Sequence, residues 1–220
     1  MIAPEFSLST SSMAVAGSTH AYLQQLLPGM VAQMAMFAAM GIGTVINEDI
    51  HRGVFDRFRS LPIARSAPVV GAVLGHTVRF CETMVVLTGV GMALGFRFHA
   101  GVVSTLAAYG LAYLSYLAFC WFSLLVGLFA PSPEATQGLT VIWTLPLTFG
   151  STIFTVDSST MPHWLQSWVA VKPVSHLADS MRALMLDGPV GNHVWYTLAG
   201  VVGITVVAFP LALTLYKRRV

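Results

Sequence analysis

The stretch NEDIHRGVFDRFRSLPIARSAP, residues 47–68, is a charged island between two long apolar runs, and it holds seven of the chain's twenty charged residues. On a helix, its apolar side chains fall on one side: Ile50, Val54, Phe58 and Leu61. Acid and base alternate on the other side: Asp49, Arg52, Asp56 and Arg59. Pro62 would end this helix, because its ring removes a donor and disfavours helical geometry at the residue before it. We predict a short amphipathic helix at a membrane surface; the alternative is a solvated loop that only fixes topology.

The composition indicates an all-α, polytopic integral membrane protein with one transmembrane domain, residues 1–220. Of its 220 residues 55% are hydrophobic and 9% charged, whereas soluble domains carry about 25% charged residues. The net charge of +2 is too small to indicate a nucleic-acid partner. Cys81 and Cys120 lie in apolar segments without a metal-binding spacing, and we interpret both as inert helix residues.

Five apolar segments are predicted to span the membrane: 22–46, 69–95, 102–130, 138–156 and 194–216. Residues 1–20 are rich in Ser, Thr and Ala, and we expect an external loop there. Residues 157–193 contain two helical stretches that are too short and too polar to span, and suit external interfacial or re-entrant helices. In the first of them Pro162 precedes Trp164 and Trp168, a pair typical of an anchor at the membrane interface.

The basic residues predict the orientation. Most of them lie in the island or in the C-terminal Lys217, Arg218 and Arg219, which places both on the cytoplasmic side. Five spans then put residues 1–20 outside, although nothing in them resembles a signal for export. We therefore expect that a further transmembrane helix precedes Met1.

The sequence carries no pattern for chemistry of its own. Neither of the two lysines, Lys172 and Lys217, follows the glycine spacing of a phosphate-binding loop. There is no HExxH for zinc and no GxSxG nucleophile elbow. We expect no catalytic, cofactor-binding or metal-binding residues and no enzymatic activity in this chain.

Arg79 and Glu82 are charged residues inside the second predicted span, where ionisable groups are costly. At a spacing of three they can pair with each other, or they can line a polar face toward a dimer partner or a substrate route. Two small-residue patterns on the same span, Gly71-xxx-Gly75 and Gly91-xxx-Gly95, favour close contact with other helices.

From about residue 20 onward the sequence resembles the membrane subunits of ABC type-2 exporters, specifically permeases of the daunorubicin-resistance type. The matching motifs are YLQQLLPG at 22–29, the island with its flanks at 47–71, ALGFRF at 93–98, LFAPSPEATQG at 128–138, and PLTFGSTIFTVDSSTMPHWLQSWVAVKPVSHLADSMRALMLDGP at 146–189. The resemblance implies six transmembrane helices with both termini cytoplasmic, dimerisation with a second permease subunit, and a separate ATPase that binds ATP and Mg²⁺.

By this resemblance the island is a coupling helix that docks on the ATPase, through Glu48, Asp49, Arg52, Gly53, Asp56, Arg57, Arg59 and Pro62. The expected function is export of a hydrophobic or amphipathic drug, antibiotic or lipid across the plasma membrane. Two alternatives remain: a proton-coupled carrier that uses Arg79 and Glu82, and a membrane anchor or enzyme without transport. An ABC ATPase encoded beside the chain would favour the exporter.

Overall fold

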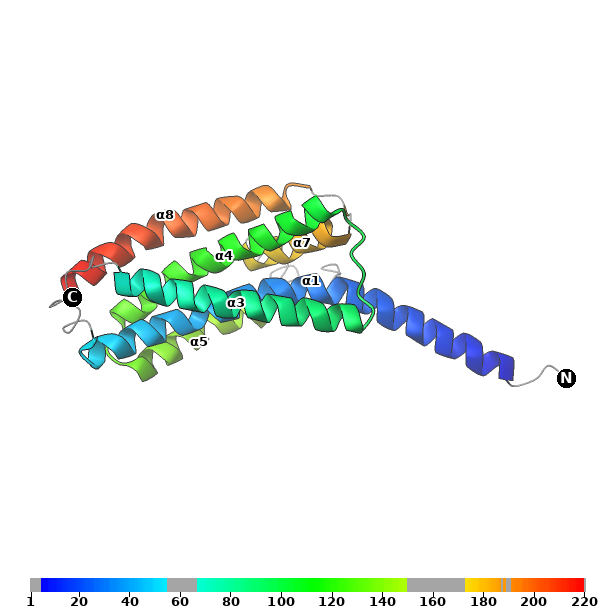
Figure 1. Cartoon of the computed structure of the whole chain (residues 1–220), viewed down its shortest axis with the longest axis horizontal. Coiled ribbons are helices and arrows are strands. Elements are labelled where there is room, and N and C mark those ends of the chain that lie inside the picture. Colours follow the sequence, from blue (N-terminus) through cyan, green and yellow to red (C-terminus); the bar gives the residue numbers. More distant parts are fainter. Residues whose placement is uncertain (1–4, 55–66, 150–172, 187, 189–190, 220) are drawn as a thin grey trace.

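A computed structural model of the chain describes residues 5–54, 67–149, 173–186, 188 and 191–219. All the regular structure in these residues is α-helical, which confirms the predicted fold class. The helices are α1 (Glu5–His51), α3 (Ala67–Ala93), α4 (Val102–Phe129), α5 (Pro133–Phe149), α7 (Pro173–Leu186) and α8 (His193–Arg219) (Figure 1).

Four helical segments of the described residues are long and apolar enough to cross a membrane: Leu23–His51, Val69–Ala93, Val102–Phe129 and His193–Leu215. They correspond to four of the five predicted spans and support a multi-pass membrane protein. The fifth, 138–156, coincides with α5, whose 17 described residues end where the described range ends. The count of five spans therefore stays a prediction.

The expectation of a loop over residues 1–20 was wrong, because α1 already begins at Glu5. No proline interrupts the chain between Pro4 and Pro28, and the Ala, Leu, Met and Gln residues there are good helix formers. In Figure 1 the first turns of α1 project beyond the bundle, at the end opposite the C-terminus.

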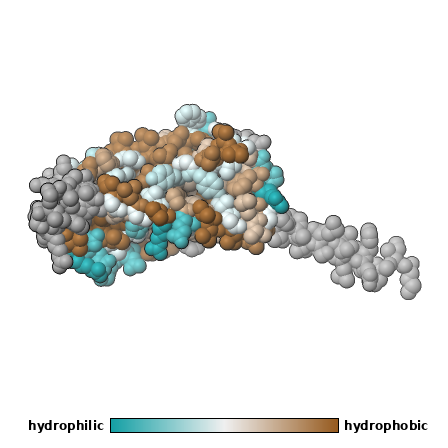
Figure 2. All heavy atoms as spheres, viewed as in Figure 1, coloured by the Kyte–Doolittle hydropathy of each residue, from teal (hydrophilic) through white to brown (hydrophobic). Residues whose placement is uncertain are grey.

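The core of the bundle lies where α1 and α4 pack against each other, and α8 and α7 cover α4. About two thirds of the apolar window of α4 is buried, against 17% for α3 and 11% for α8. The outward faces of these two helices carry large apolar side chains, such as Val78 on α3 and Val206 on α8. Figure 2 shows apolar residues spread over the flank of the bundle. A lipid environment stabilises such a surface, whereas water would not.

A buried stripe of threonines runs along α5 at every fourth residue: Thr136, Thr140, Thr144 and Thr148. Their hydroxyls donate to the carbonyl four residues earlier, at 2.7 to 3.0 Å. These hydroxyls are thus hydrogen-bonded inside their own helix, so burying them leaves none of these donors unsatisfied.

The chain does not run as one helix from Ile50 to Leu61, as the sequence pattern predicted. α1 ends at His51, and Gly53 adopts φ 65°, a left-handed conformation that glycine allows at a helix end. The Gly53 N–H donates to the Ile50 carbonyl at 3.1 Å and closes this end. Ile50 and Val54 therefore belong to separate segments, and the continuation over residues 55–66 lies outside the described residues.

The short helix α7 is packed into the bundle, in contact with α1, α4 and α8. Val174, Leu177, Ala178, Met181 and Met185 on its apolar side are all no more than 1% exposed. It begins at Pro173, a residue favoured in the first turn of a helix. Its place relative to the membrane, re-entrant or interfacial, stays a prediction.

Candidate functional site

The backbones of α1 and α4 come very close where the two helices cross. A side-chain carbon added at Gly43 would overlap the Ser123 carbonyl, and one added at Gly127 would overlap the Gly43 backbone. The Gly43 N–H donates to the Ser123 hydroxyl at 3.3 Å, and that hydroxyl donates to the Met40 carbonyl at 2.9 Å. Small residues allow this approach, and the hydrogen bonds fix it.

One turn further along α1, Asn47 is 1% exposed at the same crossing. Its Nδ2 donates to the carbonyls of Gly127 at 2.7 Å and Ala130 at 3.0 Å. Asn47 was not among the site residues predicted from the sequence. The signal was present, because an amide one turn after a glycine in an apolar segment is a typical contact between membrane helices.

The island residues that the structure describes form the C-terminal end of α1 and its turn. Glu48 and Arg52 form an exposed ion pair at 2.5 Å, four residues apart. Asp49 is half-buried beside them, and Gly53 makes the left-handed turn. The other predicted coupling residues, Asp56, Arg57, Arg59 and Pro62, lie outside the described residues, as do Pro162, Trp164 and Trp168 of the external helix.

Arg79 and Glu82 are both exposed on α3, and no ion pair joins them within the described part of the chain. They line a groove of about 480 Å³ together with Met34 of α1 and Thr83. His76 and Gly41 line its continuation, where a side chain at Gly41 would touch the His76 ring. Of the two interpretations of Arg79 and Glu82, the geometry favours the polar face.

Of the two small-residue patterns predicted to bring α3 close to other helices, one makes such a contact, at Gly91. A side chain at Gly91 would overlap Leu27 of α1, which confirms a close approach there. Gly95 ends α3 with φ 101°. Gly71 and Gly75 face open space in the described part of the chain, so the first pattern makes no helix contact here.

The opposite side of α3 forms an apolar groove of about 680 Å³ with α4. α3 reaches α4 through aromatic side chains, with Phe80 stacked on Tyr116 at 4.5 Å between ring centres. The groove lies beside this contact, lined among others by Met84, Thr88, Phe98 and Tyr109. The hydroxyls of Thr88 and Tyr109 are hydrogen-bonded at 2.5 Å. The sequence pattern did not predict this groove, because it depends on where two helices diverge.

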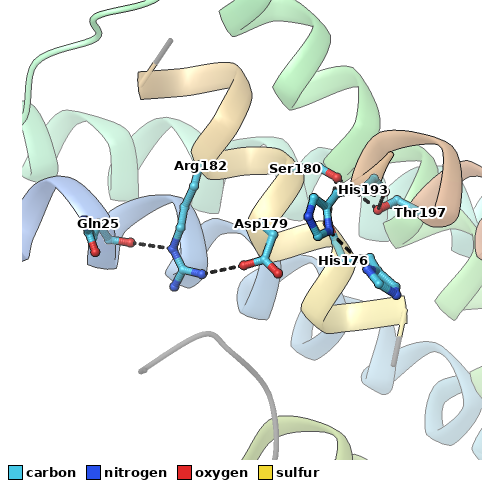
Figure 3. Close-up of polar contacts among 7 residues, drawn as sticks. All are labelled: Gln25, His176, Asp179, Ser180, Arg182, His193 and Thr197. Carbon is cyan, nitrogen blue, oxygen red and sulfur yellow. Dashed lines mark hydrogen bonds and ion pairs between the residues drawn. The ribbon is translucent and has the colours of Figure 1, made fainter. Parts of the chain in front are cut away.

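A polar cluster joins α7 to its neighbours (Figure 3). Arg182 donates to the Asp179 carboxylate at 2.9 Å and to the Gln25 carbonyl of α1 at 3.2 Å. Burial lowers the pKa of Arg182, and the nearby Asp179 charge offsets only part of this effect. An arginine guanidinium nevertheless stays protonated at physiological pH. Arg182 was not among the site residues predicted from the sequence.

The other face of this cluster meets α8. The Ser180 and Thr197 hydroxyls are hydrogen-bonded at 3.2 Å, and the Nδ1 atoms of His176 and His193 lie 3.4 Å apart (Figure 3). Further along, the Met185 carbonyl accepts hydrogen bonds from the N–H groups of His99 and Ala100 in the α3–α4 connection. Thus α7 links α1, α8 and the α3–α4 connection at one end of the bundle.

Residues 6–186 match the family described as ABC-2 type transporter. The chain is 36% identical to the "Daunorubicin resistance ABC transporter permease protein DrrB1" of Streptomyces coeruleorubidus, over 94% of this chain and 72% of that protein. It is 28% identical to the "Probable doxorubicin resistance ABC transporter permease protein DrrC" of Mycobacterium tuberculosis, over 87% of this chain and 70% of that protein.

A further relative, the "Doxorubicin resistance ABC transporter permease protein DrrB" of Mycobacterium tuberculosis, is 30% identical over 74% of this chain and 56% of that protein. No solved structure matches the chain. The family match and the helical, apolar bundle agree with each other, and the predicted resemblance is confirmed. The chain belongs to the ABC-2 type transporter family, as the membrane permease subunit of an ATP-driven exporter.

Proposed function

We propose that this permease moves hydrophobic or amphipathic compounds, such as drugs, antibiotics or lipids, out of the cell through the plasma membrane. The energy comes from ATP hydrolysis in a separate ATPase subunit, which holds ATP and Mg²⁺. The observation that carries the proposal is the apolar groove between α3 and α4, in a chain whose relatives are named for resistance to daunorubicin and doxorubicin.

The groove has the properties of a site for a drug-sized molecule. Its volume of about 680 Å³ falls within the range of about 300 to 1,000 Å³ for small-molecule pockets. Its lining is apolar apart from a few groups, among them the bonded hydroxyls of Thr88 and Tyr109. A ligand can bury its apolar body there and exchange hydrogen bonds with these hydroxyls, which favours amphipathic over purely apolar compounds.

The island supplies the contact with the ATPase. Its described residues Glu48, Asp49, Arg52 and Gly53 lie at the end of α1 that is also nearest the C-terminus (Figure 1). The alternating charges of the island, continued by Asp56, Arg57, Arg59 and Pro62, suit a partner surface with complementary charges. A second permease subunit, identical or related, completes the transporter within the lipid.

Efflux of daunorubicin, used as a fluorescent probe, tests the groove in cells that produce the chain with an ABC ATPase encoded beside it. Thr88→Val and Tyr109→Phe should each raise the substrate concentration at half-maximal efflux by about three- to tenfold, because a hydrogen bond is worth about 0.5–1.5 kcal/mol. Thr83→Val is the matched control: Thr83, like Thr88, donates to the carbonyl four residues earlier in α3, but it lines the groove of Arg79 and Glu82 instead. Equal efflux in all variants would remove the groove from the pathway.

Co-purification tests the coupling assignment. The double variant Arg52→Glu with Arg59→Glu should insert normally and lose most of the bound ATPase, because both charges are reversed. Unchanged co-purification would reject the island as the docking site. Efflux that needs no ATPase and follows the proton gradient would instead support the carrier that uses Arg79 and Glu82.

A further inference from the structure

The end of α4 leaves backbone carbonyls that its own helix does not satisfy. In a continuing helix the Gly127 carbonyl would accept from the N–H of residue 131, but residue 131 is proline and has no N–H. Ala130 has ψ 142°, an extended conformation that takes its carbonyl out of the helical ladder. The Ala130 N–H closes the helix by donating to the Val126 carbonyl at 3.0 Å.

Asn47 of α1 satisfies both of these carbonyls with one side chain. Its Nδ2 carries two N–H donors, and one goes to Gly127 and the other to Ala130. The two carbonyls also determine the orientation of the Asn47 amide. If the amide were turned around, its oxygen Oδ1 would face two carbonyl oxygens and could not bond to them. Oδ1 is buried and accepts no hydrogen bond from the described residues. An apolar residue at position 47 would avoid that buried acceptor but would take these two donors away from the Gly127 and Ala130 carbonyls.

The position of Asn47 in the chain gives this contact a further consequence. The residue directly precedes Glu48, the first of the predicted coupling residues, and lies one helical turn after Gly43 at the tight crossing. On the other side, Ala130 leads through the turn at Pro131 into α5, which begins at Pro133. A displacement of the end of α1 therefore reaches the end of α4 and the start of α5 directly through the Asn47 amide.

We propose that Asn47 is a positioning residue that transmits movement of the coupling segment, residues 48–53, to the α4–α5 corner, residues 130–134. The proposal rests on the proposed function, because it takes the segment to be moved by the ATPase. Asn47 does not itself contact the ATPase or the substrate. It makes the ends of α1 and α4 move as one body, so that ATP hydrolysis is coupled to movement of the helices.

Asn47→Asp is the informative variant, because it is similar in size but offers the two carbonyls at most one donor, from a protonated carboxyl group. Asn47→Leu removes the amide without adding a charge. Both should keep the ATPase bound but transport about tenfold less substrate per ATP hydrolysed, within the range of coupling between distant sites. Ser115→Ala is the matched control: Ser115 is buried in α4 too, but its hydroxyl bonds the Leu111 carbonyl of its own helix at 2.9 Å.

A second measurement needs no ATPase and detects the mechanical link itself. Spin labels at the exposed positions 52 and 134 report the distance between the coupling segment and the α4–α5 corner in the purified chain. Wild type and Ser115→Ala should give one narrow distribution, and Asn47→Asp a clearly broader one. A narrow distribution in Asn47→Asp, or wild-type transport per ATP, would overturn the proposal. Loss of ATPase binding would also overturn it, since Asn47 would then act in docking.

The proposed function fails separately if the wild-type chain, produced with its ATPase, shows no ATP-dependent export. The spin-label distances would still test the link through Asn47 in that case.

Discussion

Gly127 of α4 lies so close to the backbone of Gly43 of α1 that position 127 has no room for a side chain. The obstacle is backbone, which cannot rotate away as a flexible side chain would. The two helices can therefore keep their hydrogen bonds through Asn47 and Ser123 only while both positions are glycine.

Gly127→Ala should therefore destabilise the protein strongly. Overpacking a close contact costs about 1–3 kcal/mol or more, and the separation would also weaken the Asn47 bond. Gly110→Ala on the same helix is the control, since a side-chain carbon there would meet no other atom of the described residues within 4 Å and alanine is the better helix former. Thermal unfolding in detergent should show a lower midpoint for Gly127→Ala and an equal or higher one for Gly110→Ala. Equal midpoints for Gly127→Ala and wild type would refute the tight crossing.

Arg182→Ala should loosen α7 from α1. The side chain of Arg182 is 13% exposed and bonds both Asp179 and the Gln25 carbonyl. Its removal leaves Asp179 without this partner and should cost about 1.5–3 kcal/mol, the range for hydrogen bonds to charged groups. Arg97→Ala, an exposed arginine at the same end of the bundle, should change stability by less than about 0.5 kcal/mol. Chemical unfolding of the two variants side by side checks the difference, and similar losses would argue against the α7 cluster.

The stability of the fold at acidic pH should depend on Glu134, at the start of α5. Hydrogen bonds from its own backbone N–H and from Ser132 hold the pKa of Glu134 below its ordinary value of 4.5. A depressed folded-state pKa stabilises the fold above the unfolded pKa, and this contribution is lost as the pH falls through the folded pKa. Between about pH 6 and about pH 3, the melting temperature should therefore fall less in Glu134→Gln than in wild type. An identical or larger loss in the variant would contradict the shift.

The predicted orientation can be tested at two exposed positions at opposite ends of the bundle, Arg52 and Asn192. Single cysteines are introduced there in a background without Cys81 and Cys120. An impermeant thiol reagent should label position 192 on whole cells and position 52 only after permeabilisation. Labelling of position 52 on whole cells would reverse the orientation.

The sequence by itself determined where α3, α4 and α8 lie and the family to which the chain belongs. Runs of apolar residues bounded by Pro131 and the glycines near residue 95 place the ends of α3 and α4 within a few residues. These features are local, because helical hydrogen bonds join residues four apart and proline breaks them wherever it stands. The family motifs are local too, because each is a short run of consecutive residues, and the order of residues alone therefore carries the resemblance.

Only the tertiary structure decided which helices pack against each other and through which side chains. Asn47 finds its acceptors 80 and 83 residues away, and α7 is buried although its length and polarity suggested an interfacial position as readily. The groove beside Thr88 and Tyr109 exists because α3 packs on α1 and meets α4 through aromatic rings. Periodicity shows which face of a helix is apolar, but in a membrane both lipid and protein accept an apolar face. The choice between them depends on the shape of the neighbouring helices, which the order of residues in one helix does not contain.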